Sequence, residues 1–208
     1  MAIAPLPTRS EPRLVRRLTL VGFAAAVGIG AVVLLHLWRD IPYGYLTRDP
    51  SATMGAAPYL GVLSQVGLML WASAATLALA HRASLPPTPS HLQLRRFLLH
   101  SALLTAALAI DDAFLLHEQV LPRLGVPEPA VMLAWVGLVA GWLAGHARTI
   151  RRTDVALLLL ALAAFACSAG LDQVVDLHED LGQLLEEGAK FVGIAAWVGY
   201  FGGVRSER

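Results

Sequence analysis

Long apolar runs separated by short polar stretches dominate the sequence. Six runs lie near residues 14–37, 58–81, 97–118, 129–147, 154–177 and 186–203. Because an α-helix rises about 1.5 Å per residue, about 20 residues cross the roughly 30 Å hydrocarbon core of a bilayer. The fourth and sixth runs are the shortest, but helices of this length can span a membrane within a bundle. The pattern predicts an all-α, polytopic bundle of six transmembrane helices.

The composition agrees with this prediction. The 208 residues are 56% hydrophobic and 15% charged, with a mean hydropathy of +0.60, which is more apolar than soluble domains usually are. Cys167 is the only cysteine, which excludes a disulfide framework and a thiolate metal cluster. The longest stretches between runs, 39–57 and 82–96, are too short to form domains. We therefore expect a single transmembrane domain over residues 1–208.

The distribution of arginines predicts the orientation of the bundle. Twelve arginines fall on one side of a six-span arrangement: Arg9, Arg13, Arg16, Arg17, Arg82, Arg95, Arg96, Arg148, Arg151, Arg152, Arg205 and Arg208. Only Arg39, Arg48 and Arg123 fall on the other side. By the positive-inside rule, we expect both termini to be cytoplasmic. Membrane lipids are the expected partners, and the absence of a folded basic module argues against nucleic acid.

One polar motif occurs twice. "DDAFLLHE" at 111–118 aligns without gaps to "DQVVDLHE" at 172–179, and "AWVG" at 134–137 returns at 196–199. The two matches have nearly the same offset, so the similarity extends over a two-helix hairpin. We predict a parallel internal repeat of residues 97–147 and 154–203, which would place matching residues at the same membrane depth.

Helical spacing predicts how the motif residues are placed. Asp111 and Glu118 are seven residues apart, which puts them on one helix face, and the same holds for Asp172 and Glu179. A carboxylate near mid-membrane costs about 2.5–3.5 kcal/mol, so such acids usually face the bundle interior. This favours a polar cleft that opens outward. The alternative is that the terminal His and Glu residues are solvated among headgroups while Asp172 pairs with Lys190.

Two imidazoles with several carboxylates form a ligand set that suits zinc, iron or manganese better than calcium or magnesium. The candidate ligands are His117, His178, Asp111, Asp172, Glu179 and Glu186. Glu118 or Glu187 could act as general base on a metal-bound water, and Lys190 could hold an anion. No motif for a nucleotide cofactor occurs in the sequence.

Four stretches together resemble a family of uncharacterised bacterial multi-span membrane proteins, cyanobacterial ones among them: "APYLGVLSQVGLMLWASAA", "LAIDDAFLLHE", "LDQVVDLHE" and "LLEEGAKFVGIAAWVGYF". This resemblance implies a multi-pass protein of the bacterial inner (cytoplasmic) membrane and no particular activity. The arrangement is also weakly similar to the membrane hydrolases of the alkaline ceramidase type. That similarity implies a histidine-bound zinc, although the H-x-x-x-H of those enzymes is absent here.

Three functions remain open at this point. The first is a metal-dependent membrane enzyme, a hydrolase or an oxidoreductase, that acts from the outer leaflet on a lipid or another amphipathic substrate. The second is a divalent-cation or proton transporter, and the third is a structural or accessory subunit. Acids confined to the outer half favour the enzyme, because an ion path needs polar residues further inward.

Small residues at close spacing in 22–30 and 137–145 predict close helix contacts, within the chain or between copies in a homo-oligomer.

Overall fold

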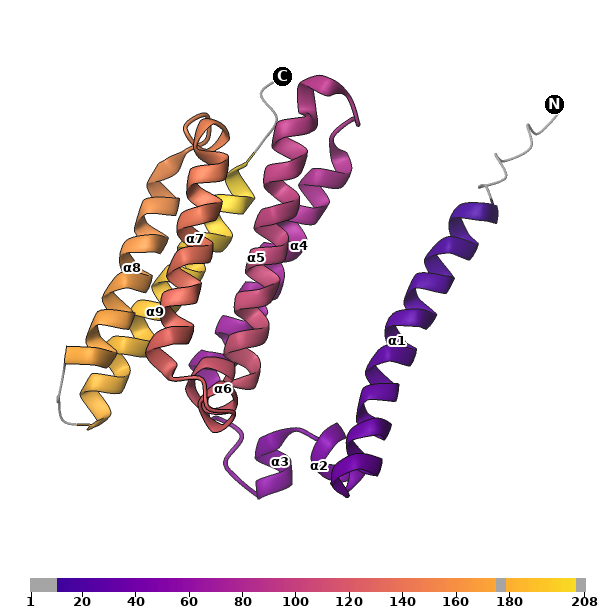
Figure 1. Cartoon of the computed structure of the whole chain (residues 1–208), viewed down its shortest axis with the longest axis vertical. Coiled ribbons are helices and arrows are strands. Elements are labelled where there is room, and N and C mark those ends of the chain that lie inside the picture. The colour runs from indigo at the N-terminus through magenta and orange to yellow at the C-terminus, as the bar shows by residue number, and fades with distance from the viewer. Residues whose placement is uncertain (1–10, 175–178, 205–208) are drawn as a thin grey trace, which may run out of the picture. The chain divides into compact units, whose positions relative to one another are not determined.

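The computed structural model describes the backbone of residues 11–174 and 179–204, which form helices and contain no strand. It describes side chains within 15–171 and 181–204. The chain divides into two compact units, Met1–Leu60 and Gly61–Arg208 (Figure 1). The single domain expected from the sequence stays a prediction.

The first unit contains one long helix and two short ones. Helix α1 runs over Glu11–Arg39, α2 over Tyr43–Thr47 and α3 over Pro50–Met54. After α1 ends, Asp40 has a φ of 52°, and the His36 ring lies 2.8 Å from the Ile41 carbonyl oxygen and stacks on Tyr43. The predicted connection at 39–57 is therefore partly helical.

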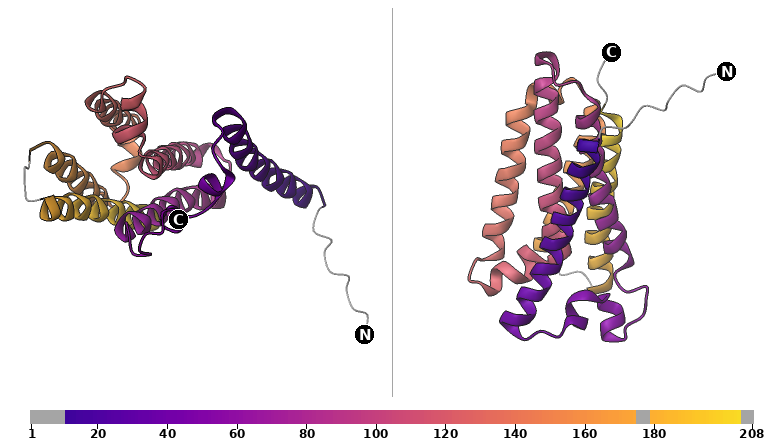
Figure 2. Two further views of the ribbon diagram at one scale, coloured as in Figure 1. Left: turned by 90° about the horizontal axis from the view of Figure 1, so that it is seen from below. Right: turned by 90° about the vertical axis from the view of Figure 1, so that its right-hand side faces the viewer.

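The second unit is a helix bundle that carries the candidate site. Its elements are α4 (Val62–Ser84), η1 (Pro89–His91), α5 (Leu92–Phe114), the π turn η2 (Leu116–Val120), α6 (Leu121–Arg123), α7 (Glu128–Ile150), α8 (Val155–Val174) and α9 (Glu179–Gly203). Helix α9 packs along α8 and α4, α5 packs along α4, and α7 touches α5 (Figures 1 and 2).

The helices have the length and composition of membrane spans. Within the described residues, four are long and apolar enough to cross a bilayer: Leu18–Arg39, Val62–Ser84, Pro89–Phe114 and Glu128–Ile150. Val155–Leu171 is a shorter apolar helix. The all-helical, membrane-type architecture is thereby confirmed. Some predicted boundaries differ from the structure: α5 covers Leu92–Phe114 where the third run was placed near 97–118, and α9 is already helical at Glu179 where the sixth run was placed to start near 186.

Trp197 lies at the centre of the core. Its side chain is 1% exposed, and its ring contacts Trp71 of α4, Trp142 of α7 and Phe165 of α8, with centroids 5.4 to 6.3 Å apart. Gly193 allows α8 and α9 to approach closely, because a Cβ there would lie 2.6 Å from the Phe165 ring. Close-packed aromatic rings therefore fill the middle of the bundle.

Two indole N–H groups in this core have hydrogen-bond acceptors on α5. The Trp197 indole N–H donates to Thr105 Oγ1 at 2.9 Å, and the Trp142 indole N–H donates to Ser101 Oγ at 3.1 Å. Thr105 and Ser101 are fully buried on α5. Between Ser101 and Thr105, the polar side chains that α5 points into the bundle therefore make structural hydrogen bonds.

Replacing Thr105 with valine should destabilise the protein by about 1–2 kcal/mol, because the buried Trp197 N–H loses its acceptor while the volume is kept. Thr76→Val is the matched control, since Thr76 is exposed and bonds only to its own helix. Unfolding of the purified protein in detergent measures both variants. Equal stability of the two would contradict the role given to Thr105.

Candidate functional site

Two consecutive aspartates lie near the end of α5, on its buried side. Asp111 is 5% exposed, and the side chain of Asp112 is 11% exposed. Consecutive residues on a helix point about 100° apart, so the two carboxylates face different neighbours. Each of them therefore needs its own partner.

Helix α5 ends immediately beyond these residues. Leu115 adopts a left-handed conformation with φ 50° and ψ 44°, and its N–H donates to the Asp111 carbonyl oxygen. A π turn over Leu116–Val120 follows, in which the Val120 N–H donates to the Leu115 carbonyl oxygen at 3.1 Å. The prediction that Asp111 and Glu118 stack on one continuous helix was therefore wrong. Asp111 also lies only one turn from the helix end, which is shallower than the sequence suggested.

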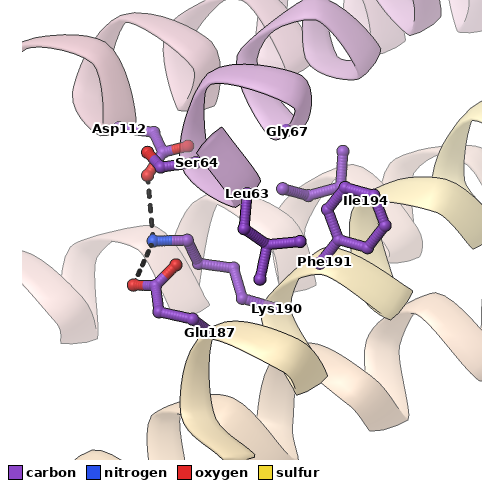
Figure 3. Close-up of a pocket in the computed structure, with 8 residues that line it drawn as sticks. All are labelled: Leu63, Ser64, Gly67, Asp112, Glu187, Lys190, Phe191 and Ile194. Atoms are coloured by element: carbon purple, nitrogen blue, oxygen red, sulfur yellow. Dashed lines mark hydrogen bonds and ion pairs between the residues drawn. The ribbon is translucent and has the colours of Figure 1, made fainter. Parts of the chain in front are cut away.

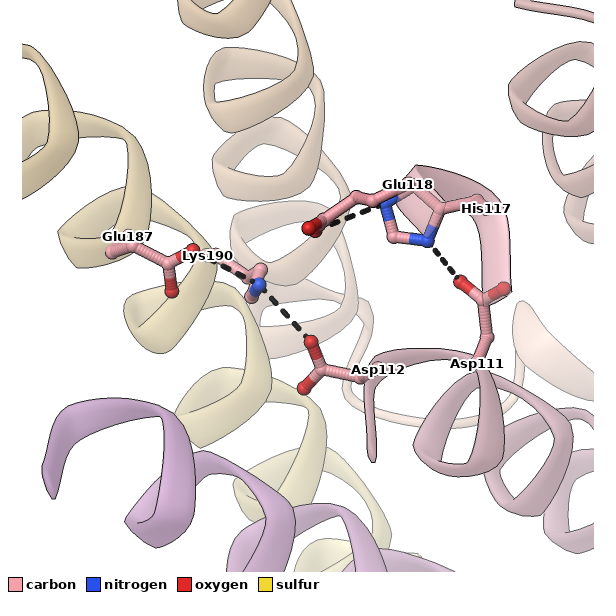
Figure 4. A network of polar contacts seen from close by, with 6 residues as sticks. All are labelled: Asp111, Asp112, His117, Glu118, Glu187 and Lys190. Atoms are coloured by element: carbon pink, nitrogen blue, oxygen red, sulfur yellow. Dashed lines mark hydrogen bonds and ion pairs between the residues drawn. The ribbon is translucent and has the colours of Figure 1, made fainter. Parts of the chain in front are cut away.

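The break turns His117 back onto Asp111. His117 Nδ1 lies 2.5 Å from Asp111 Oδ2, and His117 Nε2 lies 3.5 Å from Glu118 Oε1 (Figure 4). In an unbroken helix, residues six apart would be about 240° apart around the axis and could not meet in this way. Because a carboxylate accepts, Nδ1 is the donor in this contact, which leaves the lone pair on Nε2 when the ring is neutral.

Asp112 takes part in a second network. Lys190 Nζ lies 3.0 Å from Asp112 Oδ1 and 3.2 Å from Glu187 Oε1 (Figures 3 and 4). The Lys190 ammonium is thus held between two carboxylates from α5 and α9.

The sequence prediction missed Asp112. The residue follows Thr105 by seven positions and Ser101 by eleven, which places it on the same buried face of α5. That periodicity was the signal that could have identified it.

A narrow crevice lies beside the Lys190 network, between α4, α5 and α9 (Figure 3). It holds about 180 Å³ of empty space, its open mouth included, and is lined by Leu63, Ser64, Gly67, Asp112, Glu187, Lys190, Phe191 and Ile194. Asp112 Oδ2 is buried and has no hydrogen-bond partner within the described part of the chain. The crevice therefore combines apolar walls with an unsatisfied acceptor.

The remaining predicted site residues belong mostly to the second motif. His178 lies outside the described residues, as do the side chains of Asp172 and Glu179, and Glu186 lies on α9 next to Glu187. The structure therefore groups Asp111 with His117 and Glu118, and Lys190 with Asp112 and Glu187. Among the described side chains, no three His, Cys, Asp or Glu residues converge as a metal site requires. The metal ligand set stays a prediction.

Leu115→Val should destabilise the protein by about 1–2 kcal/mol, because a β-branched residue is strained in the left-handed region. Leu115→Gly should be tolerated, since glycine adopts this conformation freely. Leu124→Val is the control, because Leu124 is 74% exposed and has an ordinary φ of −92°. Unfolding of the purified proteins in detergent measures the stability of the three variants. Equal stability of the valine and glycine variants at position 115 would argue against a left-handed break of the helix at this residue.

The comparisons with known proteins identify a family. No curated protein and no solved structure matches the chain. The likeness to alkaline ceramidases therefore has no support beyond the sequence pattern. Residues 17–203 match the model of a family described as a domain of unknown function (DUF8692), and the chain belongs to this family.

Proposed function

We propose that the chain is a metal-dependent membrane enzyme that acts at the outer membrane face on a lipid or another amphipathic substrate. The observation that carries the proposal is the contact between His117 and Asp111. A metal-binding histidine usually donates its second ring N–H to a carboxylate, which fixes the tautomer and makes the other nitrogen a better ligand. His117 has this arrangement, with Nε2 next to Glu118.

This geometry suggests different roles for the predicted ligands. Asp111 orients His117 and does not itself reach a metal, whereas His117 Nε2 and Glu118 offer two ligand atoms at one place. The aligned residues His178 and Glu179 would complete the set if the internal repeat brings the second motif opposite the first.

Zinc, iron or manganese bound there would lower the pKa of a coordinated water and so supply a nucleophile. Glu187 is then the candidate general base, since it lies at the same end of the bundle and is 38% exposed. Lys190 holds this carboxylate in place. Its ammonium is already flanked by two carboxylates, which makes it a poor site for an anion.

The position of the charged groups favours an enzyme over a transporter. Both networks lie where α5 ends and α9 begins. Beneath them, the rings of Trp71, Trp142, Trp197 and Phe201 are packed in the core. An ion path needs polar, hydrated groups to continue inward, and a close-packed aromatic layer does not offer them.

The membrane arrangement belongs to the same proposal. Six spans by α1, α4, α5, α7, α8 and α9 would place both termini in the cytoplasm of a bacterial cell and the site at the outer face. A Cβ added at Gly137, Gly141 or Gly145 of α7 would meet nothing within 4 Å in the described part of the chain, so this face is open to a second copy in a homo-oligomer.

Cysteine labelling in intact cells tests the orientation. In a Cys167→Ser background, Leu124→Cys should react with a membrane-impermeant maleimide, whereas Ala83→Cys should react only after the cells are opened. Both positions are exposed and lie at opposite ends of the bundle. The reverse pattern would contradict the outward site.

Metal analysis tests the site itself. Protein purified after exposure to zinc, iron or manganese should retain stoichiometric metal, His117→Ala should lose it, and Asp111→Asn should bind about 10–100-fold more weakly. His100→Ala is the matched control, because His100 pairs with His146 away from this site. Wild-type protein that retains no metal would contradict the proposal.

Turnover requires a separate measurement on the metal-loaded protein. Wild-type protein in vesicles of bacterial lipids should change at least one lipid species over time, as followed by mass spectrometry, and Glu187→Gln should slow this change. Unchanged lipid profiles with metal-loaded protein would contradict a lipid-directed enzyme.

A further inference from the structure

The crevice beside Lys190 has the features of a site for a positively charged group. Its three ionic side chains are Asp112, Glu187 and Lys190, and their formal charges sum to −1. One monovalent cation would balance the crevice. Among the described side chains at this end of the bundle, acids outnumber bases when His117 is neutral: Asp111, Asp112, Glu118, Glu128, Glu186 and Glu187 against Arg123 and Lys190.

The buried, unpaired oxygen of Asp112 indicates which kind of cation fits the crevice. Asp112 uses Oδ1 for Lys190, while Oδ2 is buried without a hydrogen-bond partner among the described residues. An unsatisfied buried carboxylate oxygen is costly, so a ligand that brings an N–H donor gains a charge-assisted hydrogen bond. Ser64, which also lines the crevice, carries a hydroxyl that can accept a second N–H (Figure 3).

The apolar walls of the crevice indicate that the rest of the ligand is apolar. Leu63, Phe191 and Ile194 make one side of the crevice apolar (Figure 3). Leu184 and Val62, at the same ends of α9 and α4, are 62% and 60% exposed. A ligand with an alkyl portion next to its charged group would cover these surfaces and keep them from water.

We infer that the crevice lined by Ser64, Asp112, Glu187 and Lys190 binds the primary ammonium group of an amphipathic amine, such as an aminoalcohol lipid headgroup. The inference rests on the proposed function in one respect, since it names the class of substrate for the enzyme proposed at that end of the bundle. The ammonium donates to Asp112 Oδ2 and Ser64, and the alkyl part lies against Phe191 and Ile194. Because the crevice is narrow, binding requires the Glu187 side chain, which is 38% exposed, to move aside.

Lipid retention measured by native mass spectrometry tests this site with three probes. Phosphatidylethanolamine carries a primary ammonium, phosphatidylcholine carries a quaternary ammonium without N–H donors, and ethanolamine carries the same primary ammonium without the phosphate, glycerol and acyl chains. Wild-type protein should retain phosphatidylethanolamine at least about tenfold more strongly than phosphatidylcholine, the ratio expected for one charge-assisted hydrogen bond. Ethanolamine at equal concentration should not compete. Equal retention of the two lipids, or full competition by ethanolamine, would overturn the inference.

Variants of the crevice residues test whether lipid retention depends on this crevice and not on other parts of the protein. Asp112→Asn should lower the retention of phosphatidylethanolamine about tenfold, and Ser64→Ala should lower it less. Because Asp112→Asn could impair folding, Glu187→Gln provides a second variant at a more exposed carboxylate. It removes the net charge of −1 from the three ionic side chains of the crevice and should therefore also weaken retention. Asp154→Asn is the control, since Asp154 is an exposed acid at the other end of the bundle. Retention unchanged in Glu187→Gln and Ser64→Ala would contradict the site.

The same assay distinguishes this inference from the proposed function. His117→Ala should lose metal yet retain phosphatidylethanolamine like the wild type, because His117 does not line the crevice. Metal binding without selective lipid retention would refute the inference alone. Selective retention in protein that binds no metal would refute the proposed metal site and leave the crevice as a binding site.

Discussion

A carboxylate inside an apolar helix bundle is stable only when it has a partner, and α5 carries two such carboxylates in succession. Asp111 meets His117 at 2.5 Å, and Asp112 meets Lys190 at 3.0 Å. Their roughly 100° separation around the helix directs one to the π turn and the other to α9. The need to pair both groups explains why α5 stops at Phe114 and why a lysine stands in the first half of α9. The two networks and the crevice between α4, α5 and α9 all follow from this constraint.

The bundle keeps these groups at one end. Trp197 and its neighbouring rings fill the middle, and the indole N–H groups of Trp197 and Trp142 are bonded to Thr105 and Ser101. A close-packed core gives α4, α5 and α9 fixed positions, so the charged side chains above it are held by rigid helices. Leu115, next to these charged side chains, is strained, since it has a φ of 50° and is not a glycine. Such strain is often found at functional sites, where surrounding contacts maintain it.

The sequence predicted the helical, membrane-type fold well, because apolar runs of about 20 residues are a strong signal. It also predicted that Asp111, His117 and Glu118 act together. It missed the way in which they meet, since nothing in "DDAFLLHE" marks Leu115 as left-handed in the way a glycine would. Asp112 was missed because the repeat singles out Asp111, which has a counterpart at Asp172. Lys190 was placed correctly on the last helix, but its contact with Asp112 is tertiary and cannot be read from spacing on one helix.

The central claim is that the break after Phe114 places the protonated Nδ1 of His117 on the Asp111 carboxylate. Nitrogen-15 NMR of protein labelled at histidine measures this directly. The account predicts a His117 ring protonated at Nδ1, with a strongly downfield N–H proton that disappears in Asp111→Asn. A His117 ring that gives the same signals in wild-type protein and in Asp111→Asn would contradict it.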